Sequence, residues 1–286
     1  MRIGVVYPQI ELGGSPEAVR RIGLATEQMG YDHLLAYDHV LGAVHAGREP
    51  ALTGPYTEHD PFHDPLMMFA YLAGLTQRLN FFTGILILPQ RQTALVARQV
   101  ADLDLFSGGR FRLGVGVGWN YVEYEALGQD FKTRGVREEE QIAVLRKLWT
   151  EPVVDFTGRF DRIDRAGTAP RPVAPIPIWL GGWGERAFAR AARVGDGFVF
   201  GGRVDNVIEQ WNHVRDLVDA AGRPVDGFGG EAVVFTTKGP DAVAERIASW
   251  EAAGGTHASV NTMGHGFTET EQHVDYLSHV AEALGR

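Results

Sequence analysis

The sequence predicts a (β/α)8 barrel of the TIM type that forms a single domain over residues 1–286. Three observations favour this fold. Strand-like and helix-like patterns alternate eight times, and 286 residues is close to the roughly 250 typical of such barrels. Most connections are short, and only two are long: 42–63 after strand two and 151–175 before strand five. An open, doubly wound sheet is the alternative that the alternation leaves open.

The first strand and helix show the pattern that the rest of the chain repeats. Ile3–Tyr7 is a compact apolar run, as expected of a strand buried on both faces. Val19, Ile22 and Ala25 then recur at helical spacing, and Gly30 ends the helix. The other strands are expected at 33–37, 81–88, 111–117, 176–180, 197–200, 232–236 and 257–260. The other helices are expected near 64–76, 96–107, 135–149, 185–194, 207–218, 243–250 and 274–284.

Composition excludes several classes of function. The net charge is −9, from 27 basic and 36 acidic residues, which disfavours a nucleic-acid partner. The chain has no cysteine, which excludes disulfides, thiolate catalysis and cysteine-bound zinc. No apolar run approaches the roughly 18–20 residues that span a bilayer, and Met1–Pro8 has the pattern of a first strand, not of a signal peptide. We therefore expect a cytoplasmic protein without a membrane partner, and the apolar outer helices permit a homodimer.

Two glycine-rich turns follow predicted strands, where the active site of a barrel lies. Gly114–Gly118 ends strand four, and its glycines allow either close approach of a ligand or tight packing of strand on helix. Gly181–Gly184 opens a helix, whose free N–H groups could bind a phosphate, although an ordinary turn explains it equally well. Neither turn has the residues of a Walker A loop or of a dinucleotide-binding fold.

A histidine also stands at a strand end. Asp38-His39 follows strand two directly, so His39 is a candidate proton donor or acceptor, with a structural histidine as the alternative. Near other strand ends, Trp119, Trp183 and Phe200 could support a flat ligand or pack at the rim. The irregular spacing of five further polar residues disfavours a metal site, and none is expected. These are His45, His59, Asp60, His63 and Asp64.

Five segments occur in an order and spacing known from one protein family: Phe82–Pro89, Gln99–Arg110, Leu113–Trp119, Pro177–Gly182 and Ala191–Gly197. Together they resemble the luciferase-like monooxygenase family, over nearly the whole chain. Within that family, the pattern most resembles the branch that uses coenzyme F420, a deazaflavin. Asp38-His39 is typical of this branch, and flavin-using relatives carry a phosphate-binding arginine where this chain has Val117.

The resemblance implies a cofactor site at the barrel mouth. It implies a bulge at Thr83-Gly84-Ile85 that supports the central ring, with a cis peptide bond between Gly84 and Ile85. It places the cofactor phosphate on Gly181, Gly182 and Trp183. The full expected cofactor set is Asp38, Thr83, Gly84, Ile85, Gly116, Gly118, Gly181, Gly182 and Trp183.

The expected activity is hydride transfer between F420 and a small organic substrate, with His39 in the proton-transfer role. A sugar-phosphate dehydrogenase of the branch has a glutamate where this chain has Trp119, so sugar-phosphate oxidation is disfavoured. Two alternatives stay open: an FMN-dependent monooxygenase, and a protein that binds a flavin or deazaflavin without catalysis. The long 42–63 segment could cover the site and exclude water.

Overall fold

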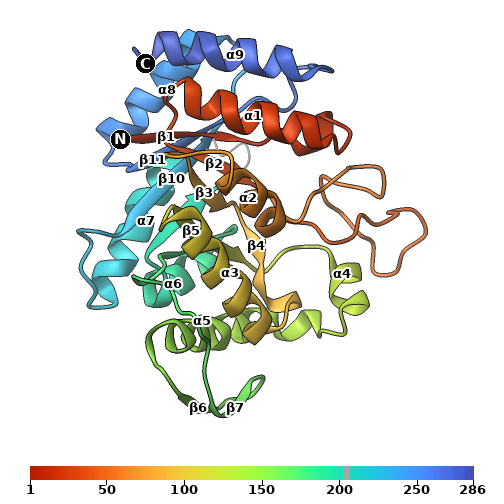
Figure 1. Ribbon diagram of the computed structural model, residues 1–286, viewed down its shortest axis with the longest axis vertical. Helices are drawn as coiled ribbons and strands as arrows, with labels where there is room; N and C mark the ends of the chain where they lie inside the picture. Colours follow the sequence, from red (N-terminus) through yellow and green to blue (C-terminus); the bar gives the residue numbers. More distant parts are fainter. Residues whose placement is uncertain (202–206) are drawn as a thin grey trace.

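A computed structural model describes residues 1–201 and 207–286, and its parallel strands close into a barrel (Figure 1). Each strand pairs with the next, and closure is complete because β3 pairs with both β2 and β5. The strands in order around the barrel are β1 (Arg2–Val6), β2 (His33–Ala36), β3 (Asn80–Thr83) with β4 (Leu86–Ile87), β5 (Phe111–Gly116), β8 (Ile178–Gly181), β9 (Gly197–Phe200), β10 (Gly229–Val234) and β11 (His257–Asn261). The predicted (β/α)8 barrel is confirmed.

Within residues 1–201 and 207–286, eight long helices cover the outside of the barrel (Figure 1). As predicted, Asp64 caps α2 by accepting hydrogen bonds from the backbone N–H groups of Leu66 and Met67, and Pro65 opens the helix. The helices are α1 (Pro16–Gln28), α2 (Pro65–Ala73), α3 (Thr93–Ser107), α5 (Arg134–Thr150), α6 (Glu185–Val194), α7 (Val207–Ala220), α8 (Pro240–Ala252) and α9 (Thr270–Ala283). No helix among the described residues is long and apolar enough to cross a membrane.

The core has two parts, because successive side chains of a strand point to opposite faces. The larger part lies between the strands and the helices and includes Val5, Leu34 and Phe81. The smaller part lies inside the barrel and consists of Val6, Leu35, Phe82, Trp179, Val199, Val233 and Met263. The barrel interior is therefore packed with side chains along its middle, and ligands have access only at its two ends.

Two segments differ from the sequence-based prediction. The 151–175 stretch, expected to be irregular, contains an antiparallel hairpin of β6 (Val154–Thr157) and β7 (Arg162–Ala166). A short helix, α4 (Tyr121–Ala126), follows β5 where no element was expected. Phe200 does not face the barrel mouth: it is buried among aromatic rings of the helix layer, including Trp211 and Trp250.

The buried His273 on α9 should make the fold sensitive to acid. Burial, helped by the nearby His265, lowers the pKa of His273 to about 4. Between the usual histidine pKa of about 6.5 and pH 4, the unfolded chain binds a proton that the folded chain does not, so stability falls as the pH is lowered through this window. We expect His273→Gln to reduce the slope of the unfolding free energy against pH in this window by up to about 1.4 kcal/mol per pH unit. Urea unfolding of both proteins across this pH range measures the difference.

The control is His279→Gln, an exposed position on the same helix. If the slope of His273→Gln equals that of the natural protein, titration of His273 does not contribute to acid unfolding.

Candidate active site

The third strand position is interrupted at the end where the active site of a barrel lies. β3 ends at Thr83 and β4 begins at Leu86, and the peptide bond between Gly84 and Ile85 is cis, as predicted. The hydroxyl of Thr83 bridges the gap: it accepts a hydrogen bond from the N–H of Gly114 (2.8 Å) and donates one to the carbonyl of Gly114 (2.7 Å). Thr83 therefore joins the interrupted strand to β5 through its side chain.

Ile85 lies over two of the predicted glycines. A Cβ on Gly116 would lie 2.7 Å from Cδ1 of Ile85, and a Cβ on Gly181 would lie 2.7 Å from Cγ2 of the same side chain. Such distances exclude any residue but glycine unless Ile85 moves. Ile85 itself is only half-buried. It therefore forms an apolar platform at the barrel mouth, seated on the backbones of β5 and β8.

Two further predicted glycines are needed for close packing. A Cβ on Gly84 would overlap the side chain of Leu35 inside the barrel, so only glycine fits at this position. Gly118 has a φ of +63°, which L-residues with a side chain seldom adopt, and a Cβ there would lie 2.9 Å from Cγ2 of Ile87. Glycine at both positions thus shapes the loop that follows the interrupted strand.

The predicted phosphate loop leads into α6. Gly182 and Gly184 both have positive φ, at 143° and 78°, and no side chain caps the first turn of the helix. Its first N–H groups are therefore left for a ligand or for water. Trp183 lies on the surface with 71% of its side chain exposed, and its indole N–H points to the carbonyl of Gly201 (3.4 Å).

Asp38 is buried and both of its oxygens have protein partners. One oxygen accepts a hydrogen bond from the N–H of Ile87 (2.9 Å), and the other accepts one from the guanidinium of Arg91 (2.7 Å). In the structure, Asp38 thus connects the end of β2 with the segment that follows the interrupted strand. This arrangement fixes the backbone next to His39.

His39 lies in an aromatic enclosure, with only 7% of its side chain exposed. The rings of Tyr56, Phe62 and Trp119 stand 5.2, 4.9 and 5.4 Å from the imidazole, measured between centroids. Tyr56 and Phe62 belong to the long 42–63 segment, and Gly54 of the same segment packs directly against the indole of Trp119. The segment therefore lies against His39, as expected of a loop that covers the site.

Glu123, on the short helix α4, is a site residue that the sequence analysis missed. It is fully buried, and one of its oxygens accepts hydrogen bonds from Nδ1 of His39 (3.0 Å) and from the N–H groups of Val40 and Leu41. Because a carboxylate oxygen accepts, Nδ1 carries the proton and Nε2 of the neutral ring is the free basic nitrogen. Among the described residues, Nε2 has no hydrogen-bond partner.

The predicted residues therefore fall into two groups at the barrel mouth. Ile85 contacts Gly116 and Gly181, which continue into the Gly182-Trp183 turn. His39 belongs to a second group with Trp119 and Glu123, built from the loops after β2 and β5. The sequence could have indicated Glu123 only through a search for a carboxylate partner of His39. Several other acidic residues were equally good candidates for that partner.

Comparison with known proteins shows which family the chain matches. The luciferase-like monooxygenase family matches residues 1–281. An uncharacterized protein of Mycobacterium tuberculosis is 36% identical over 165 residues, which is 56% of this chain and only 57% of that relative. An F420-dependent glucose-6-phosphate dehydrogenase of Nakamurella multipartita is 30% identical over 74% of this chain and 60% of its own length.

Solved structures share the fold. The monooxygenase RslO1 from Streptomyces bottropensis superimposes with a TM-score of 0.82, at 19% sequence identity, over 99% of this chain and 98% of that one. The family match extends across both groups of site residues and all strands of the barrel. The chain belongs to the luciferase-like monooxygenase family.

Proposed function

We propose that the protein is an oxidoreductase that transfers a hydride between coenzyme F420 and a small organic substrate. The observation that carries this proposal is the half-buried Ile85, held over Gly116 and Gly181 at the interrupted strand. A branched apolar side chain at this place offers a firm surface for the centre of a flat ring. The likeness to an F420-dependent dehydrogenase over 74% of the chain supports the same cofactor.

The residues present fit a phosphorylated ring cofactor. Ile85 would support the ring from below, and the exposed N–H groups at the start of α6, after Gly181, Gly182 and Trp183, would hold the phosphate. The chain departs from the flavin-using pattern at Val117, which is half-buried at the end of β5 and brings no positive charge. When bound, F420 supplies the carbon that accepts or donates the hydride.

His39 would move the proton that accompanies the hydride. Its Nδ1 is fixed by Glu123, so Nε2 is the atom that accepts a proton from a substrate hydroxyl or returns one to a substrate oxygen. The rings of Tyr56, Phe62 and Trp119 exclude water around the imidazole. With Trp119 in place of an acid, the site favours a substrate with apolar surface over a sugar phosphate. We further propose a cytoplasmic location and a homodimer.

The cofactor assignment is tested by fluorescence titration. We expect F420 to bind more tightly than FMN, because Val117 provides no guanidinium for the FMN phosphate. Val117→Arg should strengthen FMN binding and leave F420 binding weaker or unchanged. A lower dissociation constant for FMN in the natural protein would reverse the assignment and favour an FMN-dependent monooxygenase.

Turnover separates an enzyme from a protein that only binds the cofactor. The reduced cofactor should be oxidised in the presence of some members of a panel of ketones, aldehydes and unsaturated carbonyl compounds. Tight F420 binding with no turnover across the panel, in either direction, would support the binding protein without catalysis.

A further inference from the structure

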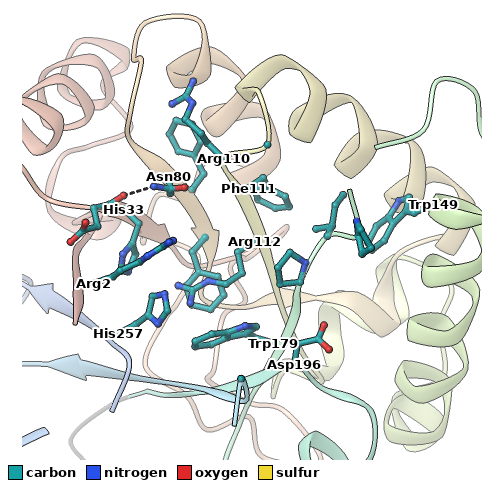
Figure 2. Close-up of a pocket in the computed structure, with 18 of the residues that line it drawn as sticks. Arg2, His33, Asn80, Arg110, Phe111, Arg112, Trp149, Trp179, Asp196 and His257 are labelled. Carbon is teal, nitrogen blue, oxygen red and sulfur yellow. Dashed lines mark hydrogen bonds between the residues drawn. The ribbon is translucent and has the colours of Figure 1, made fainter. Parts of the chain in front are cut away.

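A cavity of about 740 Å³ opens at one end of the barrel (Figure 2). It is the end opposite to His39, which follows the carboxyl end of β2. Arg2, His33, Asn80, Phe111 and His257 line it, and each is the first residue of its strand. This is the amino-terminal end of the strands, which in barrels of this type serves stability and not catalysis. The volume lies within the range of small-molecule sites.

Arg112 lies at the inner end of the cavity, held in a stack. Its guanidinium carbon lies 3.7 Å from the ring centroid of Phe82 and 3.9 Å from that of Trp179. Its Nη2 donates a hydrogen bond to the carboxylate of Glu231. Its Nη1 is buried and has no hydrogen-bond partner among the described residues. A buried cationic N–H without a partner is unfavourable, so an acceptor beside Nη1 would stabilise the site.

The cavity is positive in a chain whose net charge is −9. Four arginines and two aspartates line it, and both aspartates already pair with arginines: Asp32 with Arg286, and Asp196 with Arg146. The guanidinium of Arg2 has no such partner among the described residues. Arg110 donates only to backbone carbonyls and one hydroxyl. Arg112 is also paired, with Glu231, so the charge without a carboxylate partner is that of Arg2 and Arg110, and it favours an anion.

The cavity also has apolar walls. The rings of Trp149 and Trp179 line it, and His257 stands edge-on to Trp179 with centroids 5.0 Å apart. Figure 2 shows Arg2, Arg112 and His257 around the same space, with Trp179 beside them. A simple inorganic anion would use the charge but leave this apolar surface in contact with water.

We propose that this cavity binds a small organic carboxylate, with its carboxylate group at Arg2 and Arg112 and its apolar body against the apolar wall of the cavity. A carboxylate can accept hydrogen bonds from two guanidinium groups at once. The site is separate from the proposed cofactor site and does not depend on the proposed function.

Calorimetric titration with benzoate at low salt tests the site. We expect benzoate to bind, benzyl alcohol not to bind, and inorganic phosphate to bind more weakly than benzoate. Arg2→Gln should weaken benzoate binding about tenfold, the loss expected for one charge-assisted contact. The matched control is Arg20→Gln on α1, an arginine that pairs with Glu17 away from the cavity, and it should bind benzoate normally. Arg2 is exposed, so its replacement should not impair folding.

Three results would overturn the proposal. The first is no benzoate binding to the natural protein, and the second is equal binding by Arg2→Gln. The third is competition between benzoate and F420, which would place the benzoate at the barrel mouth. Unchanged F420 affinity in saturating benzoate supports a site at the opposite end.

Discussion

Replacing His39 with alanine should lower turnover by about 10²–10⁴, the usual contribution of a positioned general acid or base. The free Nε2 of His39 is the basic atom inside the aromatic enclosure, and alanine leaves no group there to carry the proton. The F420 dissociation constant should change much less, because the proposed ring and phosphate contacts come from Ile85 and the turn before α6. Steady-state kinetics with an accepted substrate, together with fluorescence titration, measures both quantities.

The matched control for His39 is His45→Ala. His45 belongs to the 42–63 segment and also faces Trp119, with ring centroids 6.0 Å apart. Unlike His39, its Nε2 is already bonded, to the carbonyl of Tyr56. Glu123→Gln keeps the shape of the partner of His39 and removes its charge, so it should shift the pH profile of kcat as well as lower it. Near-normal turnover of His39→Ala would make His39 a structural residue and remove it from the mechanism.

Gly114→Ala should destabilise the fold by about 3 kcal/mol, a large part of the total stability of a typical domain. A Cβ on Gly114 would overlap the carbonyl oxygen of Thr83 and lie 2.7 Å from the ring of Phe82. Neither can move away easily, because Thr83 is bonded to the backbone of Gly114 itself and Phe82 packs against Arg112. Urea unfolding measures the loss.

Gly74→Ala is the matched control for Gly114→Ala. Gly74 ends α2 with a φ of −73°, and a Cβ there would meet its nearest neighbour at 3.6 Å, which is ordinary contact. This variant should be within about 0.5 kcal/mol of the natural protein. Comparable stability of both variants would show that the strand near Thr83 can shift to accept a side chain.

The sequence predicted the barrel because its signals are local. Buried parallel strands such as Ile3–Tyr7 are compact apolar runs, and caps such as Asp64 mark helix starts. The interruption near Gly84 came from family resemblance, since a bulge leaves little trace in the alternation of side chains. α4 was missed because six residues give too few turns for an apolar periodicity to show. The β6–β7 hairpin was missed because most of its residues are exposed.

The site was predictable only where it follows strand ends. His39 and the glycine turns directly continue strands, so the barrel topology places them at the mouth. Glu123 lies 84 positions beyond His39 in the chain, and Phe62 belongs to a loop with no regular structure. Contacts of this kind depend on how loops fold over the mouth, and no local pattern encodes them.

The hydrogen bonds that Glu123 accepts fix the chain just before the 42–63 segment. One carboxylate oxygen binds the imidazole of His39 and the backbone N–H groups of Val40 and Leu41, so these three residues are anchored together. Beyond them, Gly42 begins a stretch that reaches α2 without a helix or strand (Figure 1). The segment after Gly42 can therefore move to let substrate enter and product leave, while His39, the proposed base, keeps its orientation. Changes in this segment among relatives could alter which molecules enter the site without changing the residues of the proposed proton transfer.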